Sequence, residues 1–415
     1  MKGILNTILL LGVCFMHAQM PVLENYNQVW KTQSKNSSES MPLGGGDIGV
    51  NVWVEKGDLY FYFSRSGTFD EHNTLLKLGR VKIELTPNPF LNDEGFHQEL
   101  VLKDGYVKIA QNNTEIKLWV DVFNPVIHLD ATSNVPLNMK ASYESWRYKN
   151  RHVLGKANNA NSYKWAPQGA IITYQDSIAF EDNGIKFYHK NRENTVFDVA
   201  VKQQKMEAVK NQMMNPLKHL TSGGFMYGKN MKPNGTYSGI YRDTDFKGFS
   251  LESIKPSEKH QLKLHLQITQ SEDITDWNKA LNSQISAYRS KEKNAKKKTI
   301  KWWNDFWTRS FIYTQKKEST QDSVYQIGKN YQLFRYMLGA NAYGTYPTKF
   351  NGGLFTYDPV YVDSTLSFTP DFRNWGGGTM TQQNQRLVYF PMLKSGDFDM
   401  MDSQLNYYVR LVLMR

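Results

Sequence analysis

A row of carboxamide side chains opens a predicted helix near the end of the sequence. Residues 382–385 read QQNQ, the turns after them are apolar, and Trp375 and three glycines precede them. Carboxamides donate and accept hydrogen bonds without carrying charge, so they can hold a water molecule or a sugar hydroxyl. Glycines let the backbone approach a bound molecule closely. The segment favours a water- or sugar-holding patch at Gln382 and Asn384. The alternative is that the amides cap a solvated helix and that Trp375 belongs to the core.

Chemistry that needs thiolates, metals or phosphates is not indicated. Cys14 is the only cysteine, and it lies in a segment that we expect to be removed, which excludes disulfides, thiolate metal sites and a cysteine nucleophile. No histidine pair has the spacing of metal ligands, and no glycine-rich loop carries a phosphate-binding lysine. We predict that the chain uses no metal and no cofactor.

Residues 1–18 have the pattern of a secretory signal. Lys2 precedes an apolar stretch from Ile4 to Phe15 that is too short for a good membrane span. We expect export to the periplasm or the exterior. A lipoprotein attached through Cys14 is the less favoured alternative.

The formal net charge of the 415-residue chain is +11, and its one dense basic run is KEKNAKKK at 291–298. Such a run can bind nucleic acid, or it can be the solvated face of a linker or helix. The second interpretation is favoured, because an exported protein rarely meets nucleic acid. We predict no nucleic-acid partner and no membrane span, and the oligomeric state is left open.

Two patterns divide the chain. From about residue 20 to 270, short alternating segments are separated by turn signals such as KGD at 56–58, which favours a large antiparallel β-sandwich. From residue 272 the apolar period is helical, and Asp273 or Thr275 stands where a helix cap is expected. We predict a signal at 1–18, a β-sandwich domain at 19–271, a helical linker at 272–316 and a helical domain at 317–415.

Apolar stripes mark the predicted helices. Trp302, Trp303, Phe306 and Trp307 recur at helical spacing, which favours a face that docks the linker between two domains. Three further stripes comprise Val324, Ile327, Tyr331, Phe334 and Leu338, then Leu387, Phe390 and Leu393, then Phe398, Met401, Leu405, Tyr408 and Val412. Three such helices are a poor independent domain. We therefore expect exposed apolar faces, a risk of aggregation and a chain that is part of a longer protein.

Two stretches carry a family resemblance. MPLGGGDIGVNVWVEKGDLYFYFSRSGTFDE at 41–71 leads from a glycine-rich run into a strand, a turn and another strand. FRYMLGANAYGTYPTKFNGGLF at 334–355 is followed by NQRLVYFP at 384–391. These two stretches resemble, at a distance, motifs of glycoside hydrolase family 95, the inverting α-L-fucosidases and their relatives. The segments SESMPLGGGDIG, SRSGTFDE and WGGGTM identify the chain more closely as a member of a bacterial family called domain of unknown function 5703.

The resemblance implies an amino-terminal antiparallel β-sandwich, a helical linker and the start of an (α/α)6 toroid, with a sandwich loop at the mouth of the toroid. It implies that Asn384 and Gln382 are catalytic amides that position the attacking water of inverting hydrolysis. Gln382 departs from the asparagine of the hydrolase family. The general acid of that family, a glutamate, is expected beyond Arg415, so we expect the active site of this chain to be incomplete.

Substrate contacts are suggested by the same resemblance. The predicted substrate-binding residues are Trp375, Arg373, Asp371, Asn351, Arg65, Asp70 and Glu71. Trp375 is expected to stack on a sugar ring. Arg65 and Asp70 lie on the sandwich loop expected at the cleft, and an ion pair between them that only stabilises the turn is an equal alternative.

We therefore predict an exported glycoside hydrolase-like protein whose full-length form cleaves an oligosaccharide or polysaccharide with inversion. The alternative is a non-catalytic carbohydrate-binding or surface interaction protein built on the sandwich. An acidic residue presented opposite Asn384 favours the enzyme. The sugar, the linkage and the anomer are not predicted.

Overall fold

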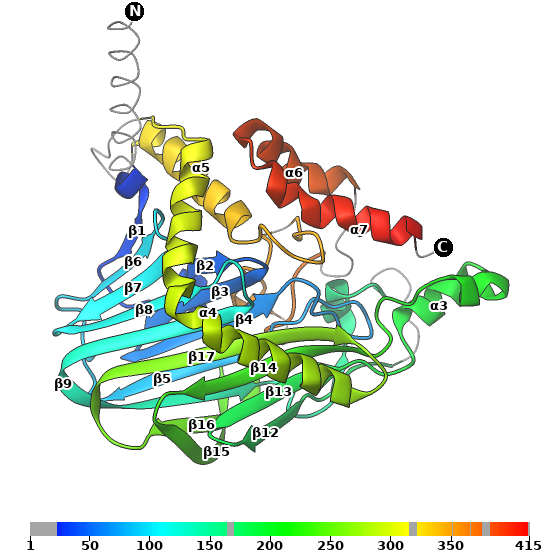
Figure 1. The fold of residues 1–415 in the computed structure, drawn as a ribbon. Coiled ribbons are helices and arrows are strands. Elements are labelled where there is room, and N and C mark those ends of the chain that lie inside the picture. The colour runs from blue at the N-terminus through cyan, green and yellow to red at the C-terminus, as the bar shows by residue number, and fades with distance from the viewer. Residues whose placement is uncertain are drawn as a thin grey trace, which may run out of the picture.

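The computed structural model describes residues 23–163, 170–314, 322–350, 352–365, 367–375 and 382–413. Strands come first along the chain and, apart from α3 and short 3-10 turns, the helices follow them (Figure 1). The strands are β1 Gln28–Trp30, β2 Met41–Gly45, β3 Ile48–Glu55, β4 Asp58–Arg65, β5 Gly79–Thr86, β6 His97–Val101, β7 Tyr106–Gln111, β8 Thr114–Val120, β9 Val126–Ser145, β10 Arg151–Val153, β11 Ile171–Thr173, β12 Ser177–Glu181, β13 Gly184–Lys190, β14 Leu220–Gly228, β15 Met231–Tyr241, β16 Thr244–Ser253 and β17 Ser257–Gln270. The helices are α3 Val196–Gln203, α4 Ile274–Arg309, α5 Ser323–Gly339, α6 Gln382–Ser395 and α7 Asp402–Leu413.

Two antiparallel sheets form a sandwich and share one long strand. The first sheet has the order β1-β6-β7-β8-β9-β17-β14-β13-β12, and the second has β2-β3-β4-β5-β9-β16-β15. The first part of β9 pairs with β8 and β17, whereas residues 138–145 pair with β5 and β16. This strand of 20 residues crosses from one sheet to the other and joins the two layers. The predicted order of a β-sandwich followed by helices is confirmed. The start of an (α/α)6 toroid and the domain boundaries stay predictions.

Tight turns join consecutive strands where the sequence predicts them. The β3–β4 hairpin turns at Lys56 and Gly57, with φ of +52° and +86°. The β7–β8 hairpin turns at Asn112 and Asn113, with φ of +48° and +59°. Two-residue turns with positive φ at both positions match the right-handed twist of hairpin strands, and Asn and Gly adopt them readily. The turn chemistry therefore sets the register of both hairpins.

One core extends from the sandwich into the helices. Val52 on β3 and Ile109 on β7 are fully buried, and they belong to the same apolar cluster as Trp303 of α4 and Met392 of α6. Each fully buried aliphatic side chain contributes about 1.5–3 kcal/mol to the free energy of unfolding. Because the cluster is continuous, the sandwich and the base of the helical region are expected to unfold together.

Helix α4 connects the two regions (Figure 1). Asp273 caps it, because its carboxylate accepts a hydrogen bond from the backbone N–H of Thr275 at 2.8 Å. Near the other end, the indole Nε1 of Trp307 donates to the carbonyl of Leu102 at 2.7 Å, and Trp303 stacks on Tyr336 of α5 with ring centres 4.8 Å apart. The predicted aromatic stripe is thus a docking face between the sandwich and α5.

The segment after α5 returns to the second sheet. Asp358 accepts a hydrogen bond from the hydroxyl of Tyr62 at 2.8 Å, and Asp371 accepts one from the indole of Trp146 at 2.6 Å. Both carboxylates are buried. The long glycine-rich loop is therefore fixed against the sandwich at both of these points.

Helices α5, α6 and α7 expose apolar faces. The side chains of Ile327, Leu387, Phe390 and Leu405 are 66%, 66%, 58% and 54% exposed. All four belong to the predicted apolar stripes. Leu338, another stripe residue, is buried, and the side chain of Val412 lies outside the described residues. The prediction of exposed apolar faces on these helices is confirmed for most of the described stripe residues.

The basic run at 291–298 lies on α4 as a largely solvated face. Lys296 pairs with Asp130 at 2.9 Å, Glu292 pairs with Lys263, and Ala295 is the buried residue of the run. Among the described residues, no helix is both long and apolar enough to cross a membrane.

Candidate functional site

A cavity of about 520 Å³ lies between the sandwich and the helical region. We call it the interface cavity. Its polar and aromatic lining includes Asp47, Arg65, Thr345, Tyr346, Tyr407 and Arg410, and part of its apolar lining comes from Phe197, Met213 and Met214. The last three belong to the insertion between β13 and β14, residues 191–219, which carries α3. Three segments far apart in the sequence therefore enclose one cavity.

Arg65 is the sequence-predicted residue that lines the interface cavity. Its Nε donates to the two carboxylate oxygens of Asp47 at 2.9 and 3.1 Å, and its Nη1 donates to the carbonyl of Leu266 at 2.9 Å. Burial raises the pKa of Asp47, although the charge of Arg65 opposes this shift. The alternative pair of Arg65 with Asp70 is replaced by the pair with Asp47. No hydrogen bond joins Nη2 of Arg65 to another described residue.

Two tyrosines form the helical side of the cavity. The rings of Tyr346 and Tyr407 lie 5.9 Å apart at an angle of 48°. Gly67 of the sandwich loop has a φ of +93° and lies so close to Tyr346 that a Cβ there would be 2.4 Å from the ring. Arg410 donates to the carbonyl of Thr345, and its guanidinium carbon is 5.9 Å from the ring centre of Tyr407. The sandwich loop thus meets the helical region at this cavity.

A second pocket of about 350 Å³ adjoins the interface cavity. Phe197, Pro216, Tyr346 and Tyr407 line both, and Asn73 lies on the second pocket alone. Ligand sites of this kind combine apolar and aromatic surface with a few polar groups that fix orientation. The two pockets share four lining residues and therefore adjoin along one surface.

A buried histidine joins two acidic side chains within the sandwich. His189 on β13 donates from Nδ1 to Asp176 at 3.0 Å and from Nε2 to Glu71 at 3.3 Å. Burial alone would lower the pKa of His189, but the hydrogen bonds and charges of Asp176 and Glu71 raise it to about 10. The protonated imidazole in turn helps to lower the pKa of each carboxylate against the opposing effect of burial.

Arg147 extends this buried network to the loop after α5. Its Nε donates to Asp176 at 2.9 Å and its Nη1 donates to Asp371 at 2.7 Å, and the carboxylate of Asp371 also accepts from the backbone N–H of Lys77 at 2.8 Å. Glu71 and Asp371, which were predicted as substrate contacts, are 0% and 5% exposed. In this structure they hold loops together, and their contact with a substrate stays a prediction.

Asp70 and Arg373 also have partners within the protein. The carboxylate of Asp70 accepts from the backbone N–H groups of His72 and Thr74 at 2.9 and 2.7 Å, and burial raises its pKa. Arg373 donates to the carbonyl of Gly353 at 2.7 Å, and burial lowers its pKa to about 10. Both side chains are buried and stabilise their own loops.

The predicted catalytic amides lie elsewhere. Asn384 is half-buried in the first turn of α6 and borders an open groove of about 850 Å³ together with the apolar face of that helix. Trp375 is 54% exposed and does not line the interface cavity. The side chain of Gln382 and all of Asn351 lie outside the described residues. The structure therefore does not bring Asn384 and Arg65 into one cavity.

The polar and aromatic lining residues that the sequence analysis missed include Asp47, Tyr346, Tyr407 and Arg410. Asp47 and Tyr346 lie inside the glycine-rich motifs, and the sequence interpretation of those motifs rested on the glycines and not on these two side chains. Tyr407 and Arg410 are three residues apart on α7, so one face of that helix presents both. No local pattern shows which face of α7 meets the sandwich.

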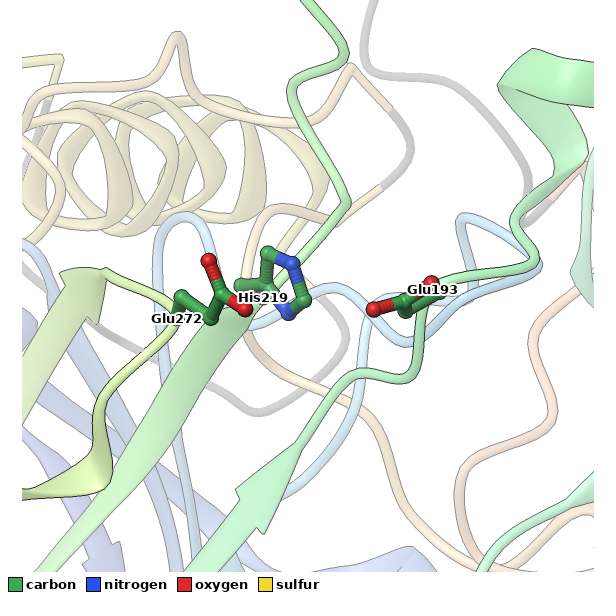
Figure 2. A group of neighbouring side chains, drawn as sticks. All are labelled: Glu193, His219 and Glu272. Atoms are coloured by element: carbon green, nitrogen blue, oxygen red, sulfur yellow. The ribbon is translucent and has the colours of Figure 1, made fainter.

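A mixed cluster of acidic residues and a histidine lies at the base of the insertion (Figure 2). Glu193, His219 and Glu272 each offer one ligand atom, and these atoms all lie within 4.8 Å of one another. His219 is half-buried, whereas both glutamates are exposed. These are residue types that hold metal ions.

The fold and the cavity define a class of protein: an antiparallel two-sheet sandwich joined through a long helix to a helical region, with a cavity where the two meet. The family described as domain of unknown function (DUF5703) matches residues 29–312, and the chain belongs to this family. No curated protein sequence matches the chain.

Two solved structures are similar to the chain at low identity. A protein assigned as a kojibiose phosphorylase from the human microbiome is 12% identical with a TM-score of 0.39, over 79% of this chain and 43% of that one. A bacterial glucoamylase complexed with acarbose is 10% identical with a TM-score of 0.37, over 93% of this chain and 54% of that one. The chain thus spans about half the length of the structures it matches.

Proposed function

We propose that the chain is the sandwich-bearing part of a carbohydrate-active protein and that the interface cavity binds an oligosaccharide. The observation that carries this proposal is the pair of tyrosine rings, Tyr346 and Tyr407, in one cavity with the Arg65–Asp47 ion pair. Sugar rings have apolar faces that pack on aromatic rings and hydroxyl groups that need fixed donors and acceptors. The cavity supplies both kinds of surface.

The more specific proposal is that the full-length protein hydrolyses the bound carbohydrate with inversion, and that Asn384 and Gln382 hold the attacking water. The family resemblance and the accessible position of Asn384 on α6 support it. The separation of Asn384 from the interface cavity favours the second candidate, a protein that binds carbohydrate without cleaving it. Export to the periplasm or the exterior remains part of either proposal.

Binding is tested with the purified chain against a panel of plant and host oligosaccharides by isothermal titration calorimetry. Tyr407→Ala is expected to weaken binding about tenfold, because an aromatic contact of this kind contributes roughly 1 kcal/mol beyond its buried area. Tyr408→Ala is the matched control, since Tyr408 is the next residue of α7 and does not line the cavity. Equal losses in both variants, or no binding of any oligosaccharide, contradict the proposed site.

Catalysis is tested separately by following the anomer of the released sugar by NMR with the full-length protein. Release of the inverted anomer, abolished by Asn384→Ala, supports hydrolysis. Binding that depends on Tyr407 without any release of sugar supports the non-catalytic candidate.

A further inference from the structure

Three side chains converge at the base of the β13–β14 insertion, where their ligand atoms lie within 4.8 Å of one another. Glu193 follows β13, His219 immediately precedes β14, and Glu272 follows β17, so each comes from a different segment (Figure 2). We propose that Glu193, His219 and Glu272 bind a divalent transition-metal ion, with Zn²⁺ as the best-matched ion.

The three side chains have no competing partners in the described residues. No side-chain hydrogen bond or ion pair joins any of them to another group, whereas most carboxylates in the sandwich are paired. Lys190 donates to the main-chain carbonyl of Glu272 and forms no ion pair with the carboxylate of Glu272. Among the described residues, neither carboxylate of the cluster forms an ion pair with a lysine or arginine.

The donor set suits a zinc-like ion. One imidazole nitrogen and two carboxylate oxygens are ligands that Zn²⁺ accepts, at metal–ligand distances of about 2.0–2.2 Å. Around a tetrahedral ion such ligand atoms are roughly 3.4 Å apart, so the present spread of up to 4.8 Å needs small side-chain rotations. Exposed glutamates can make them, and water completes the coordination. Hard ions such as Ca²⁺ prefer sites built only of oxygen, which makes the histidine decisive.

A metal ion bound at this cluster would hold the β13–β14 insertion in place. Glu193 and His219 lie near the two ends of the insertion, and Glu272 lies just beyond the end of β17. Between those ends lie Phe197 and Met213, which line the interface cavity. A bound ion would cross-link both ends of this insertion and so hold one wall of the cavity, whatever ligand the cavity takes.

The sequence does not reveal such a site, because its ligands are 26 and 53 residues apart along the chain by their numbers, 193, 219 and 272. Metal motifs are recognised by short spacings. Only the pairing of β13 with β14 and of β14 with β17 brings the three segments together.

The first test is calorimetric titration of the metal-stripped full chain with ZnCl2 and, separately, MnCl2 and CaCl2. One Zn²⁺ per chain is expected, with His219→Ala lowering the affinity at least tenfold and Glu193→Gln and Glu272→Gln each lowering it severalfold. His97→Ala is the matched control, because His97 lies 3.1 Å from Glu99 and is a second histidine–glutamate pair. This control is expected to leave the affinity unchanged.

Limited proteolysis gives a second readout. Zn²⁺ is expected to slow trypsin cleavage at the exposed Lys205 and Lys210 of the insertion in the unaltered chain but not in His219→Ala. Circular dichroism establishes that each variant is folded. The proposal is overturned by the absence of Zn²⁺ binding at millimolar concentration, by affinity that His219→Ala leaves intact, or by tighter binding of Ca²⁺ than of Zn²⁺.

Discussion

At the scale of single residues, the buried charged side chains of the sandwich form a row in which each contacts a neighbour of opposite charge. Glu71, His189, Asp176, Arg147 and Asp371 alternate in sign, and each contacts the next at 2.7–3.3 Å. A buried charge without a partner costs several kcal/mol, so each member depends on its neighbours. The series begins beside the sandwich loop at Glu71 and ends on the loop after α5 at Asp371, which fixes the two loops relative to each other.

His189 makes this network sensitive to pH in a definite direction. Its pKa is raised from 6.5 to about 10 in the folded chain. The stability that protonated His189 contributes is therefore fully present below about pH 6.5 and is lost as the pH rises through about 10. His189→Gln is expected to lower the free energy of unfolding by about 3 kcal/mol at pH 6, because two carboxylates lose their charged partner. Urea denaturation at several pH values measures this difference.

The expected pattern is a difference between the two proteins that shrinks between pH 6.5 and 10. The comparison with the variant is needed because burial lowers the pKa of Lys77 to about 7, which raises stability with pH over an overlapping range. Lys77 is unchanged in both proteins, so its effect cancels in the difference. A difference that stays constant up to pH 10 would show that His189 is neutral in the folded chain.

At the scale of elements, the glycine-rich run of β2 is explained by the approach of the helical region. A Cβ at Gly44 would lie 2.7 Å from the Cβ of Ala340, just after α5, and 2.7 Å from the carbonyl oxygen of Ile48. The hydroxyl of Tyr336 on α5 also accepts a hydrogen bond from the backbone N–H of Gly44 at 3.2 Å. The strand and the helix end are therefore in direct contact at a position where only glycine fits.

Gly44→Ala is expected to destabilise the chain by about 1–3 kcal/mol, the usual cost of forcing an extra methyl group into a packed contact. Thermal and urea unfolding measure the loss. Ala340→Gly in the same chain removes the close contact with the Cβ of Ala340, so the double variant should recover part of the lost stability. A double variant no more stable than Gly44→Ala would place the strain at Ile48 instead of at the helix.

The elements themselves were largely readable from the sequence, whereas the site was not. Lys56-Gly57 and Asn112-Asn113 fix hairpins through local φ preferences, and Asp273 caps α4 through a bond to a residue two positions away. Such signals act over a few residues. The interface cavity depends on contacts such as Gly67 with Tyr346, across 279 positions by their numbers, which no local pattern encodes. Arg65 was found because its loop belongs to a recognised motif.

At the scale of the whole molecule, the apolar surface is unevenly distributed. The largest exposed apolar side chains of α6, Leu387 and Phe390, lie beside Phe334 of α5 around one open groove. On the described surface of the sandwich, by contrast, exposed apolar residues belong to separate loops and strands: Leu91 lies between β5 and β6, Leu154 follows β10, and Ile240 lies on β15. A contiguous apolar surface promotes association, whereas scattered apolar residues do not.

Leu387→Ser combined with Phe390→Ser is therefore expected to reduce concentration-dependent association of the chain while leaving its melting temperature within a few degrees. Both side chains are more than half exposed, so their removal costs little buried area. Light scattering coupled to size-exclusion chromatography over a concentration series measures the effect.

Leu154→Ser is the control, since that side chain is 74% exposed but stands between β10 and a 3-10 turn of the sandwich. If Leu154→Ser reduces association as strongly as the double variant, general surface hydrophobicity and not the α5–α6 groove drives it. If neither variant does so, the net charge of +11 is sufficient to keep the chains apart despite the groove.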